Sequence, residues 1–152
     1  MPSFINQVAK KKNLKIVDAK VPIGIAVTAS DIRHGNRKSP SSCAIAYAAK
    51  HKVKDCVEAF VFRSCAYIEK KDSLVRYRLL GSTQKEIAIF DRSRKMEPQV
   101  FTLMPAFKSQ TLDAVMARAK KRRASKADKK TVSANPIRRP YTKVKGLREV
   151  GY

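Results

Sequence analysis

The sequence is poor in acidic residues, and it has no long apolar run. It contains 12 Asp and Glu against 34 Lys and Arg in 152 residues, so the formal net charge is +22. That imbalance lies far outside the range of an ordinary soluble enzyme. No stretch approaches 18 consecutive apolar residues, and the lysines near the N-terminus follow a short apolar patch instead of preceding one. The sequence therefore predicts neither a membrane span nor a signal peptide. We expect a protein that is soluble and intracellular, or one that is packed inside a particle.

Cysteine pairs and enzyme signatures are also missing. Cys43, Cys56 and Cys65 are odd in number and form no CxxC pair, which argues against a disulfide framework and a zinc ribbon. There is no phosphate loop, dinucleotide fingerprint, HExxH or nucleophile elbow. Of the two histidines, His51 lies about two helical turns from Cys43, too far for direct contact between thiol and imidazole. We expect a protein that is not an enzyme and holds no metal or cofactor.

The positive charge is unevenly distributed along the chain. Residues 117–152 carry 13 Lys and Arg against two acids, whereas residues 1–116 carry 21 against 10, so each part has a net charge of +11. The charge density is about threefold higher in the shorter part, a shift typical of a domain followed by an extension. We predict a basic N-terminal arm at 1–12, a domain at 13–108, and a basic helix with an extended tail at 109–152.

The remaining composition supports a folded core, because 43% of residues are hydrophobic. Runs rich in β-branched and aromatic residues predict strands, and alanine-rich or 3.6-periodic runs predict helices. The expected strands are 14–28 with a break at Pro22, 57–63, 66–69, 74–80 and 100–104. The order of elements predicts an α+β fold: a small, mostly antiparallel sheet with two short helices, then a basic C-terminal helix and an extended tail.

Side-chain caps predict where the helices begin. Ser30 and Asp31 occupy cap positions for a turn that ends at Gly35, and Ser41 or Ser42 precedes the alanine-rich helix 43–49. Thr83 and Glu86 have the spacing of a capping box for a helix that ends near Asp91. The segment 4–12 has two alternative interpretations, a short helix or a basic arm.

Two sets of side chains in the strands allow alternative interpretations. Arg76 and Arg78 alternate with apolar residues, which predicts a half-buried strand with arginines on its open face. Phe60, Phe62 and Tyr77 lie on the same predicted sheet and permit comparison with a platform that stacks single-stranded bases. The basic-glycine-aromatic string of an RNA-recognition motif is missing, so core packing is the favoured interpretation.

Three local sequence patterns between residues 25 and 104 resemble those of one known group of proteins. They are V-T-A-S-D-I followed by Gly35, then C-A-I-A-Y-A from Cys43, then Phe90-Asp91 followed by Pro98, Phe101 and Leu103. The patterns resemble small uncharacterised bacteriophage and prophage proteins with V-T-x-x-D-I-x-x-G, C-P-I-A-x-A and F-D…P-x-x-F-x-L. Ala44 stands where the group usually has proline, and the glycine expected after Phe90-Asp91 is absent. The resemblance implies a viral source, an α+β fold and a location in the virion or host cytoplasm, but no activity.

The basic extension is the strongest indication of function. Cations this dense repel one another in the free protein and release condensed counterions when they meet a phosphate polymer. Nucleic acid, DNA or RNA, is the partner that this chemistry favours, through phosphates and without base reading. An anionic membrane is disfavoured, since the helix loses its apolar face where the cations begin. A solvated tail that only aids solubility is the alternative. The predicted contacts are Lys10, Lys11, Lys12, Arg118, Lys120, Lys121, Arg122, Arg123, Lys126, Lys129, Lys130, Arg138 and Arg139.

Apolar residues return at the end of the extension. Tyr141, Leu147, Val150 and Tyr152 form either a docking peptide for a partner protein or ordinary tail composition. The first hypothesis is a phage-type, non-enzymatic nucleic-acid-binding protein of the virion or of genome packaging, which contacts viral structural proteins or copies of itself. The alternatives are a structural capsid or shell protein with genome-facing basic arms, and a ribosome-associated RNA-binding protein.

Overall fold

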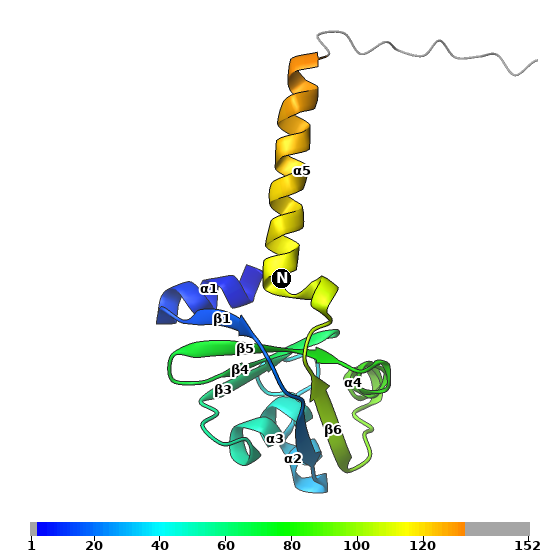
Figure 1. Cartoon of the computed structure of the whole chain (residues 1–152). Helices are drawn as coiled ribbons and strands as arrows, with labels where there is room; N and C mark the ends of the chain where they lie inside the picture. The colour runs from blue at the N-terminus through cyan, green and yellow to red at the C-terminus, as the bar shows by residue number, and fades with distance from the viewer. Residues whose placement is uncertain (1–2, 133–152) are drawn as a thin grey trace, which may run out of the picture. The chain divides into compact units, whose positions relative to one another are not determined.

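The computed structural model describes residues 3–132, and their side chains as far as residue 125 (Figure 1). The chain divides into two compact units, 1–115 and 116–152. The strands are β1 (Lys15–Asp18), β2 (Ile23–Val27), β3 (Glu58–Val61), β4 (Cys65–Glu69), β5 (Ser73–Leu79) and β6 (Gln99–Met104). The helices are α1 (Ser3–Lys12), α2 (Ala29–His34), α3 (Ala44–Lys52), α4 (Gly81–Ser93) and α5 (Leu112–Val132), with a 3₁₀ turn at Lys108–Gln110. The predicted α+β class is confirmed.

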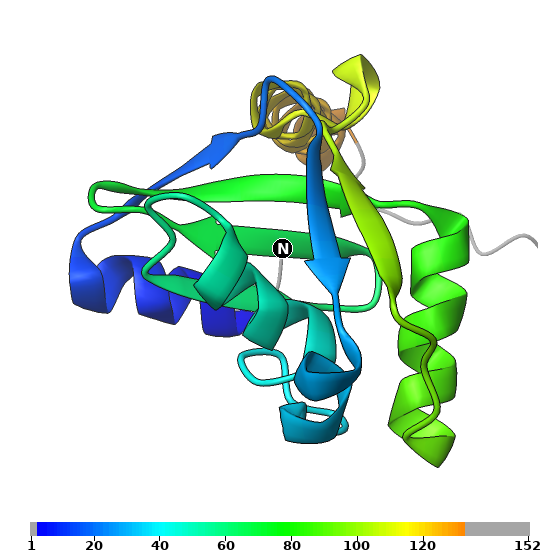
Figure 2. The same ribbon diagram turned by 90° about the horizontal axis from the view of Figure 1, so that it is seen from below.

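The sheet is curled and mostly antiparallel. Its strands run in the order β2-β6-β5-β4-β3, and β3, β4 and β5 form a meander of consecutive antiparallel pairs. β1 is the exception, because it pairs in parallel with the first half of β5, whose end pairs with β6. β2 lies alongside β6 in antiparallel register, as Figure 2 shows. β5 is therefore the strand that joins the two halves of the sheet.

The sheet carries apolar side chains on both faces, each packed on helices. On one face Tyr77 and Leu79 of β5 join a large cluster that includes Ile45 of α3 and Phe90 of α4. On the other face Leu74 joins a smaller cluster with Phe60, Tyr67 and Ile5 of α1. Figure 1 shows α1 on one side of the sheet and α2 and α3 on the other. The core packing favoured for Phe60 and Tyr77 is confirmed, since they are 5% and 6% exposed.

The predicted open face of β5 is largely covered, so that prediction is wrong. Arg76 is half-buried and its Nε donates to Oδ1 of Asp18 on β1 at 2.7 Å. The Arg78 guanidinium lies 3.9 Å from the ring centroid of Phe107, a cation–π contact. β1 and the segment after β6 cover these arginines because the sheet curls, which strand alternation alone does not reveal.

The N-terminal segment is a helix, α1. Ile5 is completely buried and Ala9 is 8% exposed, and both face the sheet. Burying a side chain such as Ile5 contributes about 1.5–3 kcal/mol. The C-terminal end of α1 is linked to β4 by the salt bridge between Lys12 Nζ and Glu69 Oε2, at 2.8 Å.

Helix starts differ from the predicted caps. Thr28 caps α2, and Asp31 is its reciprocal capping-box partner; Ser30 is the second residue of the helix and not a cap. Cys43 precedes α3 without a side-chain cap, so neither Ser41 nor Ser42 has the expected role. α4 starts at Gly81, two residues before the predicted cap Thr83, which is buried inside the first turn. Several polar residues in each segment have suitable spacing, and packing selects among them.

The V-T-x-x-D-I-x-x-G segment has a structural explanation. Val27 and Ile32 are buried, and the intervening capping box orders the turn into α2. A Cβ at Gly35 would lie 2.6 Å from the backbone nitrogen of Ala44, so only glycine lets the two backbones approach this closely. These residues build the junction between α2 and α3.

Candidate nucleic-acid interface

The first turn of α5 is fixed by side chains from the sheet. Asp18 Oδ2 accepts the backbone N–H of Leu112 at 2.7 Å, while its Oδ1 accepts Arg76. Arg76 also donates from Nη2 to the carbonyl of Gln110 at 2.6 Å. A carboxylate at a helix N-terminus satisfies free N–H groups and complements the helix dipole. The ion pair of β1 and β5 thus determines where α5 begins.

The predicted cations of α5 whose side chains the structure describes are exposed. Arg118, Lys120, Lys121, Arg122 and Arg123 lie within six consecutive residues, and no acid occurs between Asp113 and Asp128. With 100° per residue these side chains point to every side of the helix. The surface of this segment is therefore positive all round, and a phosphate polymer can be neutralised from any direction.

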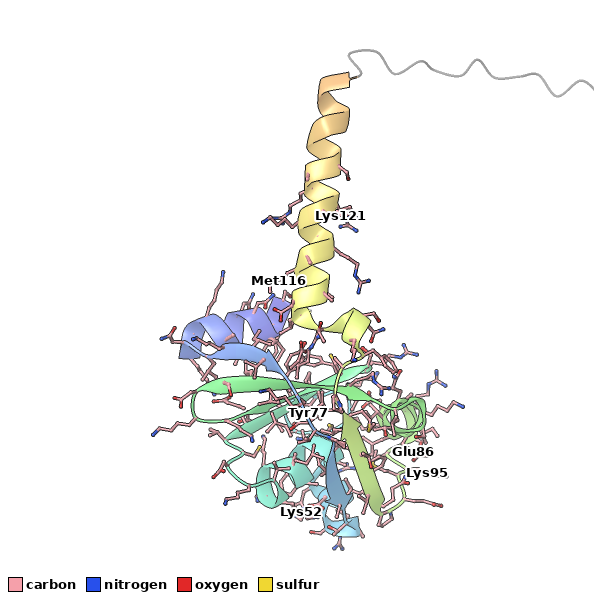
Figure 3. The ribbon with its side chains drawn as sticks, viewed as in Figure 1. Lys52, Tyr77, Glu86, Lys95, Met116 and Lys121 are labelled. Atoms are coloured by element: carbon pink, nitrogen blue, oxygen red, sulfur yellow. The ribbon has the colours of Figure 1, made fainter. Side chains whose placement is uncertain are left out.

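The apolar residues at the start of α5 recur at helical spacing but are weakly buried. Val115 is 48% exposed and Met116 is 61% exposed, whereas Leu112 and Ala119 are half-buried. Figure 3 labels Met116 and Lys121 on this helix. The helix expected from this periodicity is present as α5.

The lysines at the end of α1 are exposed. Lys10 and Lys11 are available to an anionic partner, whereas Lys12 is shared with the carboxylate of Glu69, to which its Nζ donates at 2.8 and 2.9 Å. A partner's phosphate must therefore compete with Glu69 for Lys12.

The remaining predicted contacts are only partly described. Lys126, Lys129 and Lys130 belong to α5, but their side chains lie outside the described residues. Arg138, Arg139 and the proposed docking residues Tyr141, Leu147, Val150 and Tyr152 also lie outside them.

Sequence reasoning missed a second group of cations, around the end of α4. Arg37 donates from Nη1 to the carbonyl of Arg92 at 3.2 Å, and Arg94 donates from Nη2 to the carbonyl of Arg33 at 2.8 Å. Lys38 donates its backbone N–H to Asp91 Oδ1 at 2.8 Å. The contacts between the loop after α2 and the end of α4 join residues 53 to 61 positions apart in sequence, so the two short basic runs gave no indication that they meet.

Burial and hydrogen bonds shift the pKa values of two buried groups, Asp31 and Cys43. Burial alone would raise the pKa of Asp31, but hydrogen bonds from Lys52 and Thr28 outweigh it and hold this pKa below its usual value. Burial raises the pKa of Cys43 to about 11, and the nearby Asp91 carboxylate acts in the same direction. Cys43 is therefore a protonated thiol at neutral pH.

Both histidines pack on one tyrosine. The ring of Tyr47 stacks on His34 at 5.5 Å and meets His51 edge-on at 4.7 Å, between ring centroids. Among the side chains that the structure describes, those of residues 3–125, no group of three or more His, Cys, Asp or Glu is placed to hold a metal ion. No helix of residues 3–132 is both long and apolar enough to span a membrane.

Comparison with protein-family models, curated proteins and solved structures finds no match for the chain. The phage-type resemblance of residues 25–104 thus stays a prediction, and the arrangement of the side chains has to support any functional argument.

Proposed function

We propose that the protein binds nucleic acid through the phosphate backbone, with α5 as its main contact. The supporting observation is the segment Arg118–Arg123, which carries five exposed cations on all sides of a helix with no neighbouring acid. Each phosphate contact releases condensed counterions, so affinity falls steeply with salt. The contacts reach no base edges in this proposal, and sequence preference is weak.

The first test is a charge-removal variant, K120Q/K121Q/R122Q/R123Q, in the full chain. The slope of log affinity against log salt for duplex DNA falls by about 0.9 for each phosphate that is no longer neutralised. The measurement is fluorescence anisotropy at several salt concentrations. The matched control is K15Q/K20Q/K54Q/K71Q, which removes four exposed lysines elsewhere. Equal effects of the two variants, or no binding by the wild type at low salt, would contradict the proposal.

We further propose a phage-type setting, as a virion or genome-packaging component, on the resemblance of residues 25–104. The expected result is that purified particles of the phage that encodes this protein contain it together with the genome. Its absence from particles that contain the other structural proteins would contradict this setting, while leaving nucleic-acid binding intact.

A further inference from the structure

A cleft of about 450 Å³ lies on the folded unit beside the second group of cations. Its walls are the loop after α2, the residues after β3, and α4. Its lining combines three cations, Lys38, Arg63 and Arg92, with apolar side chains that include Val61, Phe62 and Ile87. Its volume is in the range typical of sites for small organic ligands.

The polar lining of the cleft is mainly cationic. Lys38, Arg63 and Arg92 are exposed cations, and Asp91 is the single carboxylate among the lining residues that the structure describes. Asp91 already accepts the backbone N–H of Lys38 at 2.8 Å, which holds the loop against α4. The net charge of the lining therefore favours an anionic ligand.

Further cations extend this charge beyond the cleft. Arg37 is hydrogen-bonded to the carbonyl of Arg92, and Arg94 to that of Arg33. Lys95, labelled in Figure 3, follows directly after Arg94. A ligand with several phosphates along a chain can contact these positions in succession, whereas a single small anion uses only one or two of them.

The inner lining of the cleft is apolar. Val61 and Ile87 belong to the buried core, and Pro40, Phe62 and Ala88 are half-buried. Phe62 supplies an aromatic ring to this lining, and bases stack on aromatic side chains in sites for single strands. In a duplex the bases are paired and stacked inside, so they do not reach this surface without being flipped out.

We propose that this cleft holds an unpaired nucleotide of a single-stranded nucleic acid, with its base on the apolar lining and its phosphates on Lys38, Arg63 and Arg92. This inference rests on the proposed function and adds a second site with a different selectivity. α5 binds single strands and duplexes alike, whereas the cleft distinguishes them. The protein accordingly prefers single strands to duplexes of equal length.

The most direct test fills the cleft without changing its charge. Ala88→Leu places a larger side chain on the lining, and leucine is a good helix former. We expect about a tenfold loss of affinity for a fluorescent 12-nucleotide single strand, given the usual effect of losing one stacked base, and no change for the duplex. Both are measured by anisotropy on the full chain, and circular dichroism checks that the variant folds.

A charge variant provides the second test and does not depend on the folding of A88L. K38Q/R63Q/R92Q is compared with K20Q/K54Q/K71Q, which removes the same charge from exposed lysines outside the cleft. The cleft variant weakens single-strand binding more than the control variant does. Its salt slope for single strands also falls, by about 0.7 for each phosphate that is no longer neutralised.

The outcomes separate the two proposals. Equal losses in both charge variants, or a folded A88L protein with unchanged single-strand affinity, overturn the cleft assignment while α5 variants still show binding. A loss in A88L that is as large for the duplex also overturns it. A wild-type protein that binds neither nucleic acid at low salt overturns the proposed function and the cleft's ligand together.

Discussion

The identity of Gly35 is constrained by the backbone of Ala44. A Cβ there would meet the backbone of Ala44 at 2.6 and 2.8 Å, and backbone atoms of a buried helix start cannot move aside easily. Gly35→Ala is expected to lower the free energy of unfolding by about 1–3 kcal/mol, as other overpacking substitutions do. Urea denaturation measures the difference. Gly81→Ala is the control: its Cβ would meet nothing within 4 Å. A similar loss in both variants would contradict the explanation.

Asp31 couples stability to pH. Its folded-state pKa lies below the unfolded value near 3.8, so its contribution is fully present above about pH 4 and is lost as pH falls through the folded pKa. Asp31→Asn is expected to cost about 2 kcal/mol at pH 7, because it removes a charged hydrogen-bond partner of Lys52 and Thr28.

Denaturation from pH 7 to pH 2.5 measures this dependence. The gap between wild type and D31N narrows below pH 4, whereas the exposed control Asp72→Asn changes little at any pH. A gap that stays constant down to pH 2.5 would show that ionisation of Asp31 is not its source.

Arg94 occupies a backbone conformation that few residues other than glycine adopt. It ends α4 in the left-handed conformation, with φ of 58°, where glycine is the favoured residue. The phage-type pattern expects a glycine in this region. In this chain Arg94 adopts the unfavourable backbone conformation, and its guanidinium donates a hydrogen bond to the carbonyl of Arg33.

At the scale of elements, β1, β5 and α5 meet at one ion pair. Asp18 and Arg76 are 20% and 16% exposed, and the same carboxylate accepts the N–H of Leu112. Asp18→Asn is expected to reduce the free energy of unfolding by about 1–3 kcal/mol, since the variant removes one charged partner. Amide exchange at Leu112 should also become faster than in the wild type.

A double-variant cycle tests whether the pair acts together. The effect of D18N combined with Arg76→Gln is expected to be smaller than the sum of the two single effects. Additive losses, with unchanged exchange at Leu112, would indicate that Asp18 and Arg76 stabilise the fold independently.

Most elements were predictable because their signals are local. Alternation identified β5, the short run 100–104 identified β6, and the alanine-rich run identified α3, although packing moved each helix start by one to three residues. The segment 14–28 divided at Pro22 as expected, into β1 and β2. Strand partners had no such signal, because the pairing of β1 with β5 and of β2 with β6 depends on residues far apart in sequence.

At the scale of the whole molecule, the charge of the folded unit is less evenly spread than its sequence suggests. The cations of α5 were predictable from a single run, because they are adjacent in sequence. The group formed by Arg33, Arg37, Arg92 and Arg94 was not, because it exists only where two distant segments hydrogen-bond. Sequence reasoning thus found the cations of a local helix and missed those that tertiary structure assembles.

The parallel pairing of β1 has a consequence for how the chain reaches its native state during synthesis. Lys15 pairs with Ser73, and Ile23 of β2 pairs with Leu103. The first two strands, β1 and β2, therefore leave the ribosome long before their partners. In contrast, β3, β4 and β5 are consecutive and can pair as soon as β5 has been synthesised. Late closure of long loops is slow. We expect the β3–β5 meander to nucleate folding, and the N-terminal strands to stay vulnerable to proteases and chaperones until the last strand is made.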